Sequence, residues 1–530
     1  MMTTRGKALA AMILIAFAVL SFGQQPKIDL EIVAKIREEG FQRSRVMDIV
    51  NYITDVLGAR LTLSADMKRA QAWAKAEMER IGLVNTAIEP FMDYGVSWDN
   101  EYISLHLLEP DYQPLVGFPL THTPGTGGKV VCPAVIADAQ LKSDLEKYRG
   151  RLKGSAVLAT PPLAIEQTEL ARGVPRLTDE ELKALEEAVI PTPRRPGPPP
   201  GPANPDLLKP EEAIEFFKAE GAVAVLRCDG GRPGAVRGFA RPGTKDDKWS
   251  RDESLASLPI IAVTPEHYNR MYRILKRDIP VRVEVEVRNT LGEAVEKACN
   301  VLGEIPGTDL KGEVVMIGAH FDSWHASPNA SDNASGCAVA LEAARILKAV
   351  GVVPRRTIRV ALWGGEEQGI YGSTEYVQSH FGDPRDAKIG KKTDYDRFSV
   401  YFNQDYGAGR YRGIYLQGNE FARRFFAEWM KPLADLGFKT ISIQSVGSTD
   451  HVAFDQAGLP GFQFIQDRIA GTAGHTNLDF YDTLSPEDLM KNAVIMAAFV
   501  YEAAMSQERI PRKTIVVEPA APEKKAAPAL

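Results

Sequence analysis

The chain has 530 residues, a formal net charge of −6 and 44% hydrophobic residues. This length predicts two or three domains, and the composition is typical of a folded globular protein rather than a disordered or fibrous chain. The mild acidity and the absence of a long basic run exclude a polyanion-binding protein, so no nucleic-acid partner is expected.

Residues 1–23 have the pattern of a secretory signal peptide. Arg5 and Lys7 precede an apolar run from Ala8 to Phe22, and small residues around Gly23 form a cleavage site. The apolar run is shorter than the roughly 20 residues that span a bilayer, and no cysteine follows it to carry a lipid. We therefore expect a secreted or periplasmic protein with no stable membrane anchor after cleavage.

Residues 24–112 are predicted to be the helical N-terminal part of a larger domain. Ser64 is a good N-cap, and Ala70, Ala74 and Met78 recur at helical spacing before Gly82 ends the pattern. The apolar side chains of this helix are expected to face the core.

Residues 113–289 differ in texture and predict an inserted, smaller, β-rich α/β domain. Short β-branched runs are divided by Gly- and Pro-rich loops, and residues 281–287 alternate strictly, as a half-buried strand does. Residues 191–205 form a Pro-rich loop within this insert.

Residues 290–506 alternate between apolar strands and helices. This alternation predicts an α/β domain with a mostly parallel sheet flanked by helices. The predicted strands are 314–317, 357–363 and 398–402, and a helix is expected over about 336–350. The tail 507–530 is rich in Pro, Ala, Lys and Glu and is predicted to be disordered.

Histidine and carboxylate residues follow the ends of these strands, where open α/β sheets bind their ligands. His320 ends one apolar strand, and Asp322 follows on the same side of an extended chain, where its carboxylate can accept the second imidazole N–H. Glu366 and Glu367 are adjacent, so one can bind a metal ion while the other faces the bound water. Together with Asp332, Asp405 and His475, these residues supply the ligands of a site for two Zn²⁺ ions and one spare carboxylate as a base.

The motifs resemble those of the dizinc aminopeptidase and glutamate carboxypeptidase family, with a carboxypeptidase Q-like layout and a protease-associated-type insert. The resemblance covers residues 290–506, whereas 113–289 match the inserted domain only in texture. The motifs that carry it are Gly318-Ala-His-Phe-Asp322, Ser331-Asp-Asn-Ala-Ser-Gly336, Trp363-Gly-Gly-Glu-Glu367, Ser448-Thr-Asp-His451 and Gly474-His-Thr-Asn-Leu-Asp479.

This resemblance implies a role for each residue. His320 and Asp405 would bind one zinc ion, Glu367 and His475 the other, and Asp332 would bridge both. Asp322 would orient His320, and Glu366 would be the general base for attack by a metal-bridging hydroxide. In this family the peptide bond after the bridging aspartate is often cis.

The substrate remains open at this point. Peptides are the expected substrates of an exopeptidase, with an aminopeptidase slightly favoured over a carboxypeptidase or dipeptidase. Asp450 and His451 are candidates to line the substrate site, and Arg410 and Arg468 are candidates to bind a terminal carboxylate. A glutaminyl cyclase-like acyltransferase and a non-catalytic binding ectodomain are the alternatives, and no feature of the sequence sets the oligomeric state.

Overall fold

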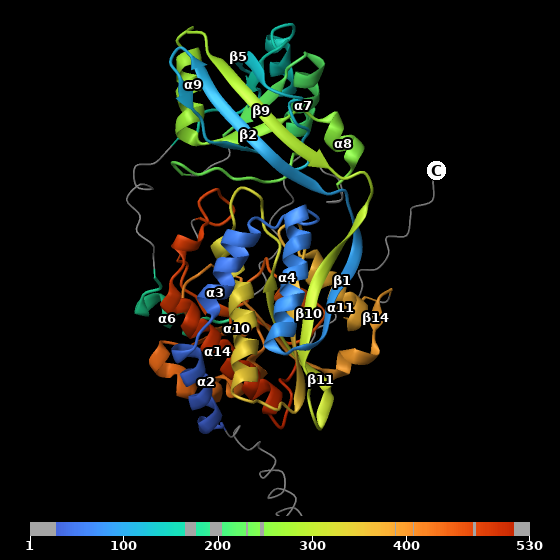
Figure 1. The fold of residues 1–530 in the computed structure, drawn as a ribbon, viewed down its shortest axis with the longest axis vertical. Coiled ribbons are helices and arrows are strands. Elements are labelled where there is room, and N and C mark those ends of the chain that lie inside the picture. Colours follow the sequence, from blue (N-terminus) through green and yellow to red (C-terminus); the bar gives the residue numbers. More distant parts are fainter. Residues whose placement is uncertain are drawn as a thin grey trace, which may run out of the picture.

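The computed structural model describes residues 28–164, 176–190, 204–228, 232–243, 249–386, 388–405, 407–469 and 473–513. The predicted signal peptide and most of the Pro-rich loop lie outside these residues. The described chain forms two lobes stacked along the long axis of the molecule, each built on its own eight-stranded sheet (Figure 1).

The larger lobe holds the sheet that carries the histidine and carboxylate motifs named above. Its strands run in the order β1-β10-β12-β11-β15-β18-β16-β17. The four central strands pair in parallel, while β1, β10 and β16 join by antiparallel pairing, so the sheet is mixed toward its edges. The strands are β1 (Val84–Gly95), β10 (Glu296–Ile305), β11 (Leu310–His320), β12 (Arg356–Trp363), β15 (Phe398–Asn403), β16 (Tyr411–Tyr415), β17 (Thr440–Ser442) and β18 (Gly461–Gln466).

Helices cover both faces of this sheet, as the alternating sequence predicted. One face is covered by α2 (Leu30–Gln42), α3 (Val46–Asn51), α4 (Ala65–Ile81), α10 (Ser335–Ala349), α12 (Arg423–Met430) and α14 (Pro486–Met505). The other face is covered by α11 (Tyr371–His380) and α13 (His451–Gln456). Within the described residues, no helix is long and apolar enough to cross a membrane.

The predicted limits of α4 are confirmed. The Ser64 side chain accepts a hydrogen bond from the Met67 N–H, and the helix stops at Gly82, whose φ of +92° is a conformation that glycine adopts without strain. Ala70, Ala74 and Met78 are fully buried in the core of the larger lobe.

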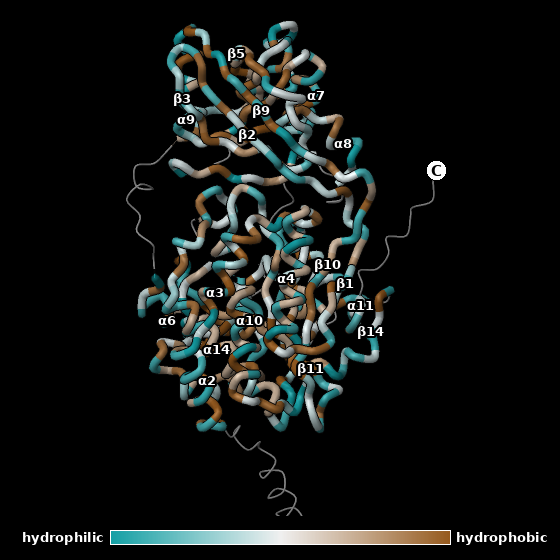
Figure 2. The backbone as a smooth tube through the Cα atoms, in the orientation of Figure 1, coloured by the Kyte–Doolittle hydropathy of each residue, from teal (hydrophilic) through white to brown (hydrophobic). Residues whose placement is uncertain are grey.

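The smaller lobe contains the strand order β3-β2-β9-β5-β6-β7-β8-β4. Residues alternate between buried and exposed along β9, and Figure 2 shows the matching alternation of hydrophobic and hydrophilic residues. The strands are β2 (Trp98–Glu109), β3 (Gln113–Pro114), β4 (Gly117–Pro119), β5 (Val130–Ile136), β6 (Ala156–Leu158), β7 (Ala224–Arg227), β8 (Ile260–Val263) and β9 (Arg282–Leu291). Its helices are α7 (Pro210–Ala219), α8 (Arg251–Ala256) and α9 (Pro265–Leu275).

The two lobes are joined by paired strands. The chain passes from β1 to β2 and returns from β9 to β10. The outgoing and returning strands lie side by side and pair antiparallel on both sides of the junction: Gly95 of β1 pairs with Glu296 of β10, and Trp98 of β2 pairs with Leu291 of β9. The chain thus leaves the larger sheet near residue 96, whereas the sequence analysis placed this boundary at 112. Residues 84–109 are two long strands rather than helix, because half-exposed ribbon strands lack the apolar pattern that a sequence search detects.

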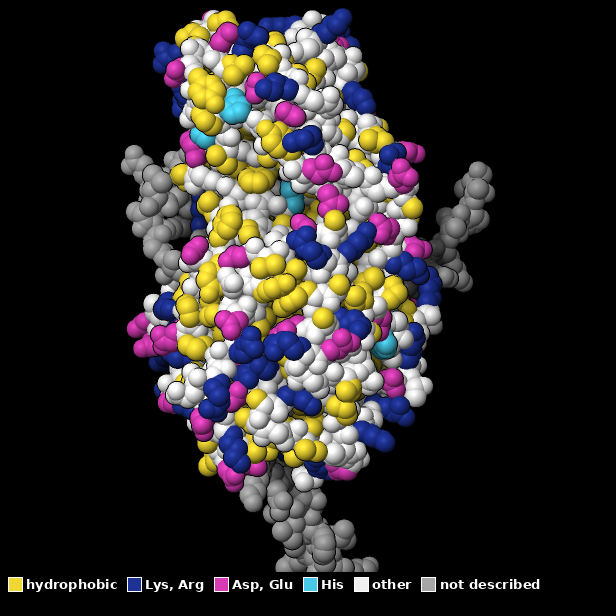
Figure 3. All heavy atoms as spheres, in the orientation of Figure 1, with side chains coloured by type: hydrophobic (Ala, Val, Ile, Leu, Met, Phe, Trp, Pro, Cys, Tyr) yellow, Lys and Arg dark blue, Asp and Glu magenta, His cyan; other side chains and the backbone are white. Residues whose placement is uncertain are grey.

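Two further segments lie elsewhere than the sequence indicated. Helix α6 (Asp179–Glu186) belongs to the insert by sequence but packs beside β17 on the larger lobe (Figure 1). The start of the predicted tail is also docked, because Ile510 is buried and the Lys513 ammonium lies 2.6 Å from the Asp455 carboxylate. On the face drawn in Figure 3, basic and acidic side chains are interspersed without a large area of one sign.

Candidate metal and active site

Two groups of ligand-type side chains meet at the carboxyl ends of the central parallel strands. His320 ends β11, Glu366 and Glu367 follow β12, and Asp405 follows β15. Asp332 lies in the loop before α10, and His475 lies after β18. The parallel pairing of β11 with β12 and β15 brings these strand ends to one edge, which explains why residues far apart in the sequence converge.

Asp332 lies between the two histidines. Its Oδ1 is 3.1 Å from the His320 Nε2, and its Oδ2 is 2.9 Å from the His475 Nε2. Asp405 Oδ1 lies 3.3 Å from the same His320 nitrogen, and Glu367 Oε2 lies 2.9 Å from the same His475 nitrogen. The side chains therefore form two triads that share Asp332: His320, Asp332 and Asp405, and Asp332, Glu367 and His475.

The donor set of these triads suits zinc. Within each triad the ligand atoms lie within 4.8 Å of one another, and each offers one imidazole nitrogen and carboxylate oxygens. Among the described residues, the buried Glu367 Oε1 has no hydrogen-bond partner in the protein, which is costly for a carboxylate oxygen unless a cation or water meets it.

The crowding of carboxylates controls the protonation of the site. Although burial opposes it, the neighbouring Asp332 and Glu367 carboxylates raise the pKa of His475 to about 11. Burial and the nearby Asp332 charge raise the pKa of Glu367 to about 7. Burial, together with the charges of Asp405 and Asp450, raises the pKa of Glu366 well above its ordinary value. The site thus has excess acidic oxygen, which is the electrostatic setting of a cation site.

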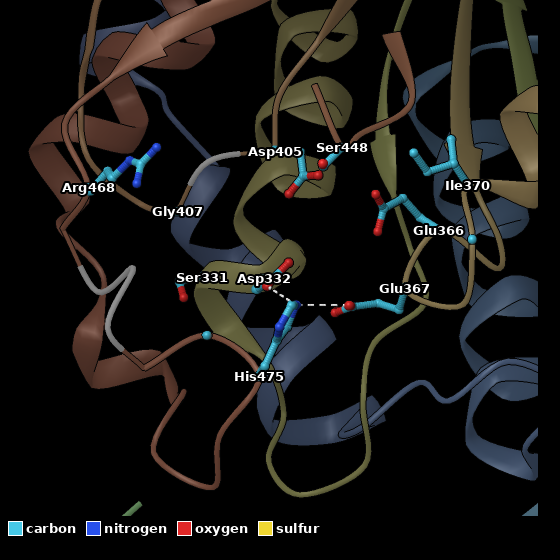
Figure 4. A pocket seen from close by; sticks show the side chains of 12 residues that line it. Ser331, Asp332, Glu366, Glu367, Ile370, Asp405, Gly407, Ser448, Arg468 and His475 are labelled. Carbon is cyan, nitrogen blue, oxygen red and sulfur yellow. Dashed lines mark ion pairs between the residues drawn. The ribbon is translucent and has the colours of Figure 1, made fainter. Parts of the chain in front are cut away.

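Glu366 faces the cavity beside both triads. Its Oε2 lies 4.0 Å from the His320 Nε2, and its side chain is 9% exposed. Figure 4 shows Glu366 and Glu367 extending from the same loop, with Glu367 directed to His475 and Glu366 directed into the open space beside Asp405. The cavity has a volume of about 570 Å³, within the range of small-molecule sites, and it opens to solvent.

Asp322 acts on the glutamate loop rather than on the imidazole. Its two carboxylate oxygens accept hydrogen bonds from the Glu366 N–H at 3.0 Å and the Glu367 N–H at 3.1 Å. The His320 Nδ1 donates instead to the main-chain carbonyl of Asp322 at 3.0 Å, while the Asp322 carboxylate is 3.9 Å away. The expected carboxylate–imidazole hydrogen bond is therefore replaced, because the backbone carbonyl is closer and the two N–H groups hold the carboxylate.

Asp479 is a counterpart of Asp322 to which the sequence analysis gave no role. Its buried carboxylate accepts hydrogen bonds from the Ser331 N–H at 2.8 Å and the Asp332 N–H at 3.1 Å. Burial raises its pKa to about 6. In the sequence, the position of Asp479 at the end of the motif 474–479, four residues after His475, could have marked it as a residue of the site. The Asp332–Asn333 peptide bond is cis, as the family resemblance implied.

Buried Arg60, which no motif marked, braces the loop between His320 and Asp332. Its guanidinium donates to the main-chain carbonyls of Phe321 and Pro328, both at 2.8 Å. A single arginine far away in sequence thus holds the loop, and only the fold reveals it.

The candidate substrate residues separate into two groups. Asp450 and His451 are fully buried; the His451 Nε2 bonds the Val446 carbonyl at 3.0 Å, whereas Ser448 of the same motif lines the cavity. Arg468 lines the cavity and extends toward it in Figure 4.

Arg410 and His325 lie outside the residues that line the cavity. The Arg410 Nε is 3.7 Å from the buried Asp467 carboxylate. His325, which lies in the loop after β11, is buried and donates from Nε2 to the Pro119 carbonyl at 2.7 Å.

Comparison with known proteins shows what the region that carries the site resembles. Residues 300–500 match the model of peptidase family M28. Together with the relatives below, this match indicates a zinc-dependent peptide hydrolase. The α/β fold is similar to that of M28 aminopeptidase structures.

Curated relatives match either most of the chain or only part of it. Human Carboxypeptidase Q is 22% identical over 486 residues, which cover 92% of this chain and 89% of that protein. Aminopeptidase YwaD of Bacillus subtilis is 31% identical over 205 residues, which cover 37% of this chain and 42% of that protein.

Solved structures show the same fold. A Peptidase M28 precursor from Shewanella amazonensis has a TM-score of 0.64 at 22% identity and covers 92% of this chain and 99% of its own. The zinc aminopeptidase BSAP from Bacillus subtilis has a TM-score of 0.53 at 20% identity and covers 87% of this chain and 94% of its own.

Proposed function

We propose that this chain is a two-zinc exopeptidase that hydrolyses the peptide bond next to a free terminus. The observation that carries the proposal is the pair of triads that share Asp332 beside an unshared carboxylate, Glu366. One zinc ion would be held by His320, Asp332 and Asp405, and the second by Asp332, Glu367 and His475. Bound zinc supplies an activated water and polarises the peptide carbonyl.

Glu366 moves the proton in this mechanism. Its carboxylate accepts a proton from the attacking water and returns it to the departing amine, so that one residue acts first as base and then as acid. Glu366 belongs to neither triad, so its carboxylate stays available for this exchange. Asp322 contributes by fixing the backbone of Glu366 and Glu367 through its two hydrogen bonds.

An aminopeptidase is the favoured form of this activity. Asp332, Glu367 and Asp405 would be neutralised by the two zinc ions, which leaves the Glu366 carboxylate at the cavity wall to attract the free ammonium of a peptide. The similarity of this chain to Aminopeptidase YwaD and to the zinc aminopeptidase BSAP also supports an aminopeptidase.

A carboxypeptidase is the second candidate, and Arg468 is the observation that favours it. Among the described residues that line the cavity, Arg468 is the one with a basic side chain of the lysine or arginine type. A guanidinium can bind a carboxylate with two parallel hydrogen bonds. The similarity to Carboxypeptidase Q extends over most of the chain.

The test is mass spectrometry of digests of one peptide in three forms: free, N-blocked and C-blocked, each with zinc and with a chelator. We expect zinc-dependent removal of residues from the free amino end, which N-blocking abolishes. Cleavage that survives N-blocking but not C-blocking would establish the carboxypeptidase, and an Arg468→Gln variant would then show a raised KM with little change in kcat. Conversion of an N-terminal glutamine peptide without chain cleavage would identify a cyclase, and no reaction on any peptide would overturn the exopeptidase proposal.

We also infer export from residues 1–23, which give a secreted or periplasmic enzyme. The supporting pattern lies outside the described residues. The mass of the mature chain recovered from culture medium or periplasm tests it: a mature chain that begins near residue 24 is expected, and a full-length intracellular chain would contradict it.

A further inference from the structure

Within the described residues, a short segment of the smaller lobe, residues 232–243, contacts the loop that carries His475. This segment crosses from the insert to the loop that carries His475. Arg237 pairs with Thr476 in an antiparallel bridge. The Asn477 side chain makes two hydrogen bonds to the backbone of this segment. Its Oδ1 accepts from the Val236 N–H at 2.6 Å, and its Nδ2 donates to the Gly234 carbonyl at 3.2 Å. The Asn477 N–H also donates to the Val236 carbonyl at 3.1 Å.

An aromatic contact from the same segment reaches the imidazole itself. The Phe239 ring lies edge-on to the His475 ring, with centroids 5.6 Å apart and planes at 75°. Phe239 is in turn held edge-on by Trp324 of the larger lobe, with centroids 5.2 Å apart. Edge-to-face contacts of this kind fix the orientation of a ring in addition to burying area.

His475 needs this external support more than His320 does. Its backbone has a φ of +59°, a left-handed conformation that is unfavourable for a non-glycine residue and persists only where neighbouring contacts hold it. Its side chain is 41% exposed, whereas that of His320 is 1% exposed. No hydrogen bond to the His475 Nδ1 is recorded among the described residues, while the His320 Nδ1 is anchored on the Asp322 carbonyl.

The lobe that supplies the segment is itself firmly placed. The Val96 N–H donates to the Trp249 carbonyl at 3.0 Å, and the His325 Nε2 donates to the Pro119 carbonyl at 2.7 Å. An apolar cluster spans the junction and contains Leu61, Leu63, Tyr94, Trp98, Trp249, Ala298 and Trp324. The segment that contacts the His475 loop therefore belongs to a lobe whose position is fixed by hydrogen bonds and apolar packing at the junction.

We propose that residues 234–241 of the inserted domain are a positioning element that holds His475 in the geometry of a zinc ligand. This inference rests on the proposed role of His475 as a ligand. The second zinc ion would then be held jointly by the two lobes, and Phe239 and Asn477 are positioning residues that act through His475. The insert thereby sets the affinity of one zinc position and leaves the other, built wholly within the larger lobe, unchanged.

The test compares two variants that remove independent contacts. Phe239→Ala removes the ring contact, and Asn477→Ala removes the two side-chain hydrogen bonds but leaves the backbone pair. Each protein is equilibrated with zinc buffered by a graded chelator, and zinc per chain is measured by elemental analysis. We expect one of the two zinc ions to be lost at a 10- to 100-fold higher free zinc concentration in each variant, as is usual when the support of a metal ligand is removed.

Three controls separate positioning from general damage. Phe216→Ala truncates an aromatic ring of the same lobe whose recorded contacts are with Phe217 and Arg149, and it should bind zinc like the wild type. Phe239→Tyr keeps the ring and should restore affinity. The unfolding temperature of the zinc-free variants should stay close to that of the zinc-free wild type.

Kinetics give a second, independent readout. The variants should recover kcat at saturating zinc with KM unchanged, whereas a substrate-binding role would raise KM at every zinc concentration and overturn the proposal. Wild-type zinc affinity in both Phe239→Ala and Asn477→Ala would also overturn it. A wild-type chain that binds no zinc at all would instead overturn the proposed function, and the positioning role with it.

Discussion

The two halves of the candidate site are built in different ways. His320 is buried at the end of a central strand. Its imidazole is held by the Asp322 carbonyl, and the loop that follows is held by Arg60 of the larger lobe, although His325 of that loop also contacts the insert. His475 lies at the boundary between the lobes, is 41% exposed, and is contacted by an aromatic ring from the insert. This difference suggests that one of the two proposed zinc positions would follow from folding of the α/β core, whereas the other would also depend on how the lobes are docked.

The largest expected effect comes from Glu366, which lies beside both halves. Glu366→Gln should lower kcat by about 10²- to 10⁴-fold, because the amide cannot take the proton from water. Zinc per chain should stay at the wild-type value, since Glu366 belongs to neither triad. Glu375→Gln on α11 is the matched control and should leave kcat unchanged; loss of zinc in Glu366→Gln would show that the residue is a ligand instead.

Zinc should stabilise the fold, and the two halves should contribute unequally. At free zinc 100-fold above its dissociation constant, the free energy of unfolding should rise by about 2.7 kcal/mol for each zinc position. Calorimetry with and without chelator measures this change. His475→Ala should remove part of the gain and lower the stability of the zinc-free protein modestly, because the imidazole pairs with Asp332 and Glu367 there. His320→Ala should destabilise the zinc-free protein more, because it empties a fully buried position. Equal losses in the zinc-free proteins would contradict the proposed asymmetry.

Asp322 and Asp479 provide a paired comparison of the loops. Each buried carboxylate accepts two backbone N–H groups, one pair in the Glu366–Glu367 loop and the other in the Ser331–Asp332 loop. Asp322→Asn and Asp479→Asn should each weaken zinc binding about 10- to 100-fold, because an amide offers only one acceptor and leaves a buried N–H without a partner. Competition with a chromogenic chelator measures the affinity, and unchanged binding in both variants would show that the loops hold their shape without these bonds.

The smallest expected effect concerns the docking of the lobes and its pH dependence. Burial lowers the pKa of His325 to about 4, so the folded protein binds fewer protons at this residue than the unfolded chain does. The contribution of neutral His325 is therefore complete above pH 6.5, the ordinary pKa, and is lost as the pH falls toward 4. Between pH 7 and 5.5 the wild type should lose about 1 kcal/mol more stability than His325→Asn in urea unfolding. Equal losses in the two proteins would show that His325 does not report on this interface.

The sequence locates the candidate ligands of both halves but not the contacts that hold His475. Strand ends, helical spacing and adjacent glutamates are local patterns, so β11, β12, α10 and the ligand-type residues beside them could be located from the chain alone. Contacts between lobes leave no local pattern. Phe239 has ordinary surroundings in the sequence, and Asn477 lies in the motif 474–479 without a role of its own there. The role of both depends on a docking geometry that only the fold provides.

The failures at residues 84–109 have a related cause. Strands β1 and β2 are half-exposed and carry bulges, so their side chains lack strict alternation, and their identity depends on pairing with strands some 200 positions later, such as Gly95 with Glu296. The same holds for α6, which lies in the insert by sequence and on the larger lobe in space. Long-range pairing decides these elements, and local propensity does not.

The paired entry and exit strands of the smaller lobe also bear on the evolution of this architecture. Because the chain leaves and re-enters the larger sheet at neighbouring positions, a module between them can be gained, exchanged or lost without disturbing the order of the catalytic strands. Exchange of the inserted module at this joint would preserve the fold of the larger lobe and the proposed zinc position of His320, Asp332 and Asp405. The second position would have to be rebuilt by selection on the new module, so module and metal loop are expected to diversify as a unit.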